Sequence, residues 1–236
     1  MESRNAGVMC RGTKVDRPGE FFKGWSQAAL DDWTSMEFAH AHAANVVLFS
    51  EREEANGLYV VLEGDVRISI NSSEGKRLSL RIARRGDVLG LSSAMGGMPY
   101  ETTAETLYPT RVAHISRRDF QGFMSRHPEI YMNVTEELSR HVGMICHQLR
   151  NVGLSASAPE KLARLLLEWS SNDQPNGTGT RMRFSLTHEE IGEFIGASRE
   201  TVTRTLSTFK HRRLVSFRGS MLEIPNRSAL AVYAGA

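Results

Sequence analysis

Residues 186–209 constrain this chain most strongly, because they hold two short helical patterns separated by a glycine, in the order LTHEEIGEFIGASRETVTRTLSTF. Thr187 suits the N-cap of the first helix, and Glu190 stands three residues later, where its side chain can complete a capping box. Gly196 can adopt the left-handed conformation that ends a helix, and Ser198 can then cap a second one. The spacing therefore predicts a helix-turn-helix.

The second helix of this pair has two different faces. At about 100° per residue, Val202, Leu206 and Phe209 fall on one apolar arc. Arginine can contact guanine through two hydrogen bonds, glutamate accepts from the cytosine amino group, and threonine can touch a thymine methyl group. The residues of the opposite arc are of these types, and we expect them to read bases: Arg199, Glu200, Thr203 and Arg204, with Ser207 beside them.

Contacts to DNA phosphates would fix the register of this helix, and helix N-termini attract anions. We therefore expect phosphate contacts from Thr187, His188 and Ser198. Two alternating apolar segments, 214–218 and 221–224, then flank a Gly-Ser turn, which predicts a β-hairpin. A hairpin directly after a recognition helix is typical of a wing, and its Arg218 is a further expected phosphate contact.

The charge distribution supports the same interpretation. Residues 181–227 hold nine Lys/Arg against five Asp/Glu, or +4, whereas the rest of the chain holds twenty against twenty-two, or −2. The small net charge of +2 therefore hides a basic C-terminal region, as polyanion binding requires. The alternative is a solvated basic helix in an ordinary bundle, but the cap, the turn glycine, the divided faces and the hairpin all favour DNA.

The N-terminal part has a different pattern. Short apolar segments broken by glycines run from about residue 45 to residue 116, and this predicts a β-sandwich or barrel. The first twenty residues are polar and expected to be loose, without the apolar segment of a signal peptide. No apolar run has transmembrane length, and two cysteines make no disulfide scaffold, so we expect a cytoplasmic protein that does not contact membranes.

A long helical pattern joins the two parts, at about residues 128–152. Its apolar residues recur at alternating steps of four and three, as in a coiled coil: Tyr131, Thr135, Leu138, Val142, Ile145, Leu149 and Val152. One interpretation is a helix packed on its own domain. The other is a homodimer seam formed by Leu138, Val142, Ile145 and Leu149, since palindromic sites need two recognition helices about one DNA turn apart.

This order of parts resembles the superfamily of the catabolite activator protein and the fumarate–nitrate reduction regulator. The resemblance covers nearly the whole chain and is most specific in EEIGEFIGASRETVTRTL and LYVVLEGDVRIS…GDVLG. It implies an α+β protein with a cyclic-nucleotide-binding-like β-roll (jelly roll), a dimerisation helix and a winged helix-turn-helix. It also implies a TGTGA-like inverted repeat in double-stranded DNA, with Arg199 and Arg204 on guanines and Glu200 on a cytosine, and RNA polymerase as a partner.

The sensing half departs from that family's pattern. Members that bind cyclic AMP carry a glutamate where Leu91 stands, an arginine where Thr102 stands, and a threonine–serine pair where Cys146 and His147 stand. Without the guanidinium, a cyclic phosphate loses its strongest charge-assisted partner. We therefore do not expect cyclic AMP in the usual mode, and the effector is unknown. The matching positions define a tentative effector pocket: Gly90, Leu91, Ser92, Thr102, Thr103, Cys146 and His147.

Other chemistry is poorly supported. Cys10 and Cys146 cannot provide the four ligands that an iron–sulfur cluster normally needs, and we predict no metal site. No nucleophile–base constellation stands out, so we do not expect this protein to be an enzyme.

The chain is expected to divide into four parts: a loose segment (1–20), a sensor domain (21–127), a dimerisation helix (128–153) and a DNA-binding domain (154–236). The alternative function is a ligand-binding β-roll whose helical domain mediates protein contacts.

Overall fold

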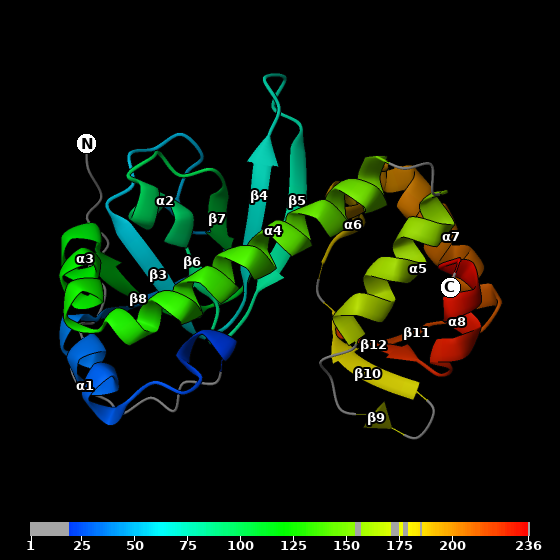
Figure 1. Cartoon of the computed structure of the whole chain (residues 1–236). Helices are drawn as coiled ribbons and strands as arrows, with labels where there is room; N and C mark the ends of the chain where they lie inside the picture. The colour runs from blue at the N-terminus through cyan, green and yellow to red at the C-terminus, as the bar shows by residue number, and fades with distance from the viewer. Residues whose placement is uncertain (1–18, 154–156, 171–174, 177–178, 185, 236) are drawn as a thin grey trace. The chain divides into compact units, whose positions relative to one another are not determined.

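The computed structural model describes residues 19–153, 157–170, 175–176, 179–184 and 186–235. These residues form two compact units, the first running through Ile145 and the second beginning at Cys146. The boundary between the units falls inside one helix, α4 (Tyr131–Gly153), and each unit is described separately (Figure 1).

Two four-stranded antiparallel sheets build the first unit. The first sheet has the order β1-β8-β3-β6, with strands β1 (Phe38–His42), β8 (Thr110–Ser116), β3 (Gly57–Glu63) and β6 (Val88–Leu89). The second has the order β2-β7-β4-β5, with strands β2 (Val47–Phe49), β7 (Thr103–Thr106), β4 (Val66–Asn71) and β5 (Arg77–Ala83). Strands β4 and β5 form a hairpin whose turn uses Gly75 at φ 78° (Figure 1). These strands confirm the predicted β-roll.

Alternation along the strands sends side chains to two separate apolar clusters. On β3, Leu58, Val60 and Leu62 belong to one cluster and Val61 belongs to the other, as period-2 burial requires. The first cluster is covered by helices and is rich in aromatic rings, with Trp25 stacked on Phe123 at 5.4 Å between ring centroids. The helical elements of this unit are short: η1 (Glu20–Phe22), α1 (Gln27–Met36), α2 (Leu91–Gly96), α3 (Arg117–Arg126) and η2 (Pro128–Ile130), followed by α4.

The second unit places four helices against a small antiparallel sheet. Its sheet has the order β11-β12-β10-β9, from β11 (Ser216–Arg218), β12 (Met221–Ile224), β10 (Gly179–Arg183) and β9 (Pro175–Asn176). Its helices are α5 (Ala158–Trp169), α6 (His188–Ile195), α7 (Arg199–His211) and α8 (Arg227–Tyr233). Helix α5 contacts α6, α7 and α8 and buries Leu162 and Leu166 there. The helix-turn-helix and its hairpin are therefore present as the sequence predicts.

Some expectations fall outside what is described. Of the first twenty residues only Gly19 and Glu20 are described, and Glu20 opens η1. Cys10 lies outside the described residues, as do residues 154–156 at the start of the expected DNA-binding domain. Within the described part of the chain, no helix is both long enough and apolar enough to span a membrane.

Candidate DNA interface and sensing domain

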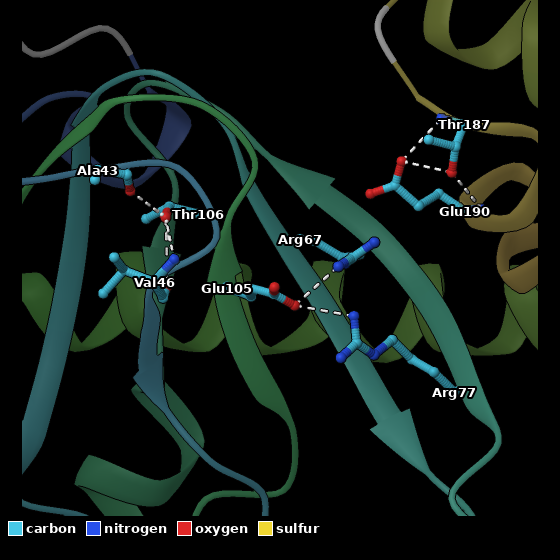
Figure 2. Close-up of polar contacts among 8 residues, drawn as sticks. All are labelled: Ala43, Val46, Arg67, Arg77, Glu105, Thr106, Thr187 and Glu190. Atoms are coloured by element: carbon cyan, nitrogen blue, oxygen red, sulfur yellow. Dashed lines mark hydrogen bonds and ion pairs between the residues drawn. The ribbon is translucent and has the colours of Figure 1, made fainter.

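Helix α6 begins with the predicted capping box. The amide of Glu190 donates to the Thr187 hydroxyl at 3.2 Å, and the amide of Thr187 donates to the Glu190 carboxylate at 2.8 Å (Figure 2). Two amide donors that the helix itself cannot satisfy are thereby paired. The start of the helix is fixed by these side chains, and Thr187, proposed to contact phosphate, lies at this exposed end.

Two glycines shape the turn between α6 and α7. Gly196 has φ 63° and ends α6, as predicted from the sequence. Gly192 was not singled out by the sequence analysis, yet a Cβ atom there would lie 2.4 Å from the Ala197 carbonyl oxygen. Only glycine permits this close approach of the two backbones, and a glycine inside an otherwise regular helical pattern was the available signal. Ser198 then caps α7 by accepting from the amide of Thr201 at 3.3 Å.

The two predicted faces of α7 are both present. Val202, Leu206 and Phe209 are buried. All four proposed base-reading side chains are exposed: Arg199, Glu200, Thr203 and Arg204. Hydrogen bonds to its own backbone amide and to Ser198 hold the pKa of Glu200 below its ordinary value, so this carboxylate is charged at neutral pH.

Basic side chains also lie on and beside the wing. Arg218 lies beside the hairpin turn with its side chain 77% exposed, and its Nε lies 3.7 Å from Glu223. Arg181, across the sheet, also pairs with Glu223, and this hydrogen bond lowers the pKa of the Glu223 carboxyl. Lys210, at the end of α7, lies 4.5 Å above the ring of Phe217. The hairpin is thus held against the C-terminal end of α7, and Arg218 remains open to solvent.

The tentative effector residues of the first unit are already engaged within the protein. Leu91 opens α2 and is fully buried in the aromatic cluster. The Ser92 hydroxyl donates to Glu101 at 2.6 Å, and the Thr103 hydroxyl accepts from the amide of Glu51 at 3.0 Å. Gly90 has φ 71° and would meet the ring of Tyr100 if it carried a Cβ. Thr102 is half-buried, and Cys146 and His147 are exposed on α4 in the second unit.

Aromatic side chains occupy the space between the two sheets. Tyr100 is stacked on Phe49 at 4.0 Å between ring centroids, and the Tyr100 hydroxyl lies 2.8 Å from the Gly57 carbonyl. Tyr59 packs on Phe49 at 5.5 Å, and burial raises the pKa of Tyr59 to about 12. The sequence analysis missed this group, because nothing in a strand pattern shows which aromatic rings stack.

An ion-pair network joins the β-roll to α4. Arg81 on β5 lies 2.6 Å from Asp87 and 3.5 Å from the Nε2 of His141. His141 lies 2.9 Å from Glu137, which also pairs with Arg140. Burial opposes ionisation of Glu137, but His141, Arg140 and Arg81 together hold its pKa below the ordinary value. A second network lies on the same sheet, where Glu105 on β7 pairs with Arg67 on β4 at 2.8 Å and with Arg77 on β5 at 3.0 Å (Figure 2).

The predicted seam on α4 is largely solvent-exposed in the single chain. Val142, Ile145 and Leu149 are 61%, 47% and 63% exposed, whereas Leu138 is partly buried against the aromatic cluster. These three side chains recur at steps of three and four, so they form one stripe along the helix. Contiguous exposed apolar side chains of this kind are typical of protein–protein interaction surfaces.

Among the described residues, no three His, Cys, Asp or Glu side chains converge in a group that could hold a metal ion. Cys146 is a free, exposed thiol.

Comparison with known proteins matches both units. Residues 40–127 match the family model of the cyclic nucleotide-binding domain, and residues 160–233 match that of the Crp-like helix-turn-helix domain. The chain is 27% identical over 215 residues to the CRP-like cAMP-activated global transcriptional regulator of Mycobacterium tuberculosis, covering 89% of this chain and 94% of the relative. It is 25% identical over 203 residues to the cAMP-activated global transcriptional regulator CRP of Salmonella typhimurium, covering 86% and 96%.

Solved structures agree on the fold. FixK2 from Bradyrhizobium japonicum superposes with a TM-score of 0.76 at 23% identity, covering 85% of this chain and 98% of that one. The two matched domains, their order along the chain and the described capped helix-turn-helix lead to one assignment. The chain belongs to the CRP/FNR superfamily of transcription regulators.

Proposed function

We propose that this protein is a homodimeric, sequence-specific regulator that recognises a TGTGA-like inverted repeat in double-stranded DNA. The observation that carries the proposal is the outward face of α7, on which Arg199, Glu200 and Arg204 are exposed. Two arginines and a carboxylate offer the groups that read G·C base pairs in the major groove. Thr187, His188, Ser198 and Arg218 bind the flanking phosphates and set the register.

Dimerisation through α4 supplies the second recognition helix. The exposed stripe of Val142, Ile145 and Leu149, with Leu138 beside it, forms the seam. Residues 128–153 therefore act as the dimerisation helix, between a sensor of residues 21–127 and a DNA-binding domain of residues 154–236. RNA polymerase is the expected partner at promoters, and the cytoplasm is the expected location.

The sensing half is not built for cyclic AMP in the usual mode. Leu91 replaces a carboxylate that would bind the ribose, and its side chain is committed to the aromatic cluster. Thr102 replaces the guanidinium that would pair with the phosphate. Between the sheets, Tyr100 and Phe49 fill the space with stacked rings. The effector positions of the first unit, Gly90, Leu91, Ser92, Thr102 and Thr103, therefore suit a different ligand or none.

A gel shift tests the DNA-binding proposal. The full chain is titrated into a labelled TGTGA palindrome and into a scrambled duplex of the same composition. The salt concentration is the same in both titrations, because the affinity for non-specific DNA depends strongly on it. We expect tighter binding to the palindrome for the wild type, and a smaller preference for Arg199→Ala. Equal binding to both duplexes by the wild type would favour the alternative, a ligand-binding module whose helical domain contacts proteins.

A further inference from the structure

A hydrogen bond joins the two helices of the helix-turn-helix on the exposed face of α7. The Nδ1 atom of His188, the first residue of α6, lies 2.7 Å from the hydroxyl oxygen of Thr203 in the middle of α7. The same hydroxyl donates to the carbonyl oxygen of Arg199, one turn earlier, at 2.8 Å. Thr203 is thus held from two directions although its side chain is exposed.

The position of the protons follows from these two contacts. A threonine hydroxyl has one proton, and here it is donated to the Arg199 carbonyl. Both contacts can be hydrogen bonds together only if His188 donates to Thr203, with the proton on Nδ1. Since the hydroxyl has no proton left, Thr203 cannot donate a hydrogen bond to a base. The group that remains for apolar contact is its γ-methyl.

Both hydrogen bonds also fix how the side chain is oriented. A helical threonine divides between two χ1 rotamers, one of which directs the hydroxyl to the carbonyl four residues back. The bond from His188 requires that same hydroxyl position, so the two contacts select one rotamer together. At about 100° per residue, Thr203 lies between Arg199 and Arg204 around the helix, within the exposed face.

We propose that Thr203 reads a thymine through its methyl group and that His188 is the positioning residue that holds this methyl toward the base. The inference rests on the proposed function, because it assumes that this face of α7 enters the major groove. The C5-methyl of thymine is the apolar group that an A·T pair presents in that groove, and a protein can recognise the pair through it. His188 would thereby contribute to specificity without contacting a base.

The test measures the contact between the γ-methyl of Thr203 and the C5-methyl of a thymine. Each thymine of the preferred half-site, on both strands, is replaced in turn by deoxyuridine, which differs only in lacking the C5-methyl. Affinities are measured by fluorescence anisotropy at fixed salt for the wild type, Thr203→Val, which keeps a methyl, and Thr203→Ser, which keeps only the hydroxyl. We expect one thymine at which deoxyuridine weakens the wild type and the valine variant by about fourfold, the ratio for burying one methyl group, and leaves the serine variant unchanged.

The role of His188 is tested in the same assay by a double-mutant cycle. His188→Ala should reduce the thymine-to-deoxyuridine ratio toward one, and His188→Asn, whose amide can donate in place of Nδ1, should restore it. In the Thr203→Val background, which has no hydroxyl to orient, His188→Ala should leave the ratio unchanged. A general loss of affinity for all duplexes would instead reflect a lost phosphate contact of His188, and it would not alter the ratio.

The outcomes separate this inference from the proposed function. If the wild type binds the palindrome no better than scrambled DNA, the proposed function fails. If the wild type prefers the palindrome but no thymine responds to deoxyuridine, or the serine variant keeps the response, methyl reading by Thr203 is overturned. A His188→Ala variant with an unchanged ratio would overturn the positioning role alone.

Discussion

At the scale of single residues, we propose that α7 reads bases and that the wing binds phosphates. We expect Arg199→Ala or Arg204→Ala to weaken binding to the preferred site by about 1–3 kcal/mol and to relax selectivity at one base pair. Arg218→Ala removes a solvent-exposed cation from the wing, so it should weaken all sequences similarly and reduce the salt dependence. Competition binding against a library of single-base variants, at two salt concentrations, distinguishes these effects. An Arg199→Ala variant with wild-type selectivity would mean that α7 does not read the site.

Glu137 provides a residue-scale test of the link between the β-roll and α4. Its carboxylate pairs with His141 and Arg140, and we expect Glu137→Gln to lower the free energy of unfolding by about 1–3 kcal/mol at pH 6. The pKa of Glu137 is lower in the folded chain, so its stabilisation is present above the ordinary value of 4.5 and is lost as pH falls through the folded pKa. The difference between wild type and variant should therefore narrow below about pH 4.5.

Denaturant unfolding at pH 6, 5 and 3.5 measures this difference. Glu136→Gln, one residue away on the exposed side of α4, is the matched control and should change little at any of these pH values. A difference for Glu137→Gln that stayed constant down to pH 3.5 would contradict the assigned ion pairs.

At the scale of elements, the exposed stripe of α4 is the seam that we expect to hold two chains together. Ile145→Asp would place a carboxylate in that seam without a partner, which is strongly unfavourable. Sedimentation should then show monomers, with specific DNA binding lost. Gly143→Asp adds the same charge to the far side of the helix, where nothing lies within 4 Å of an added Cβ, and it should remain dimeric. If Ile145→Asp also stayed dimeric, the interface would lie elsewhere.

The elements that could be predicted are those with strong local signals. The capped helices α6 and α7, the hairpin of β11 and β12, and most strands of the roll follow from caps, turn glycines and alternation. Helices α1, α3, α5 and α8 were not predicted. Helix α3 has only Phe120, Phe123 and Met124 buried in an otherwise polar segment, and strand β10 contains one apolar residue, Met182. Such segments are stabilised by tertiary packing, which no short window of sequence contains.

At the scale of the whole molecule, the DNA-binding half was easier to predict than the sensing half. A helix exposes one face at a regular period, so periodicity alone places Arg199, Glu200 and Arg204 together on the exposed face of α7. The interior of a β-roll is filled by residues distant in sequence, such as Phe49 and Tyr100, and their stacking appears only in three dimensions. The same holds for Leu91, which the sequence places at an effector position and the structure places in an apolar cluster.

The sensing half yields a prediction about ligands. We expect cyclic AMP at micromolar concentration neither to bind measurably nor to change DNA affinity. Thr102 stands where family members that bind cyclic AMP carry an arginine, so the phosphate of cyclic AMP would have no guanidinium partner at this position. Arg81 is already paired with Asp87 at 2.6 Å. Isothermal titration of the full chain with cyclic AMP, repeated in the presence of the palindrome, provides the measurement. A clear micromolar heat signal that also tightened DNA binding would show that the roll accommodates the nucleotide.

The central claim is that two recognition helices of one dimer read the two halves of an inverted repeat. The most direct measurement compares, at fixed salt, the affinity and stoichiometry of the full chain on an intact TGTGA palindrome and on duplexes in which one or both half-sites are scrambled. The account predicts two chains per intact palindrome, a large loss of affinity when one half-site is scrambled, and only salt-sensitive, non-specific binding when both are. Equal affinity for all three duplexes would contradict it.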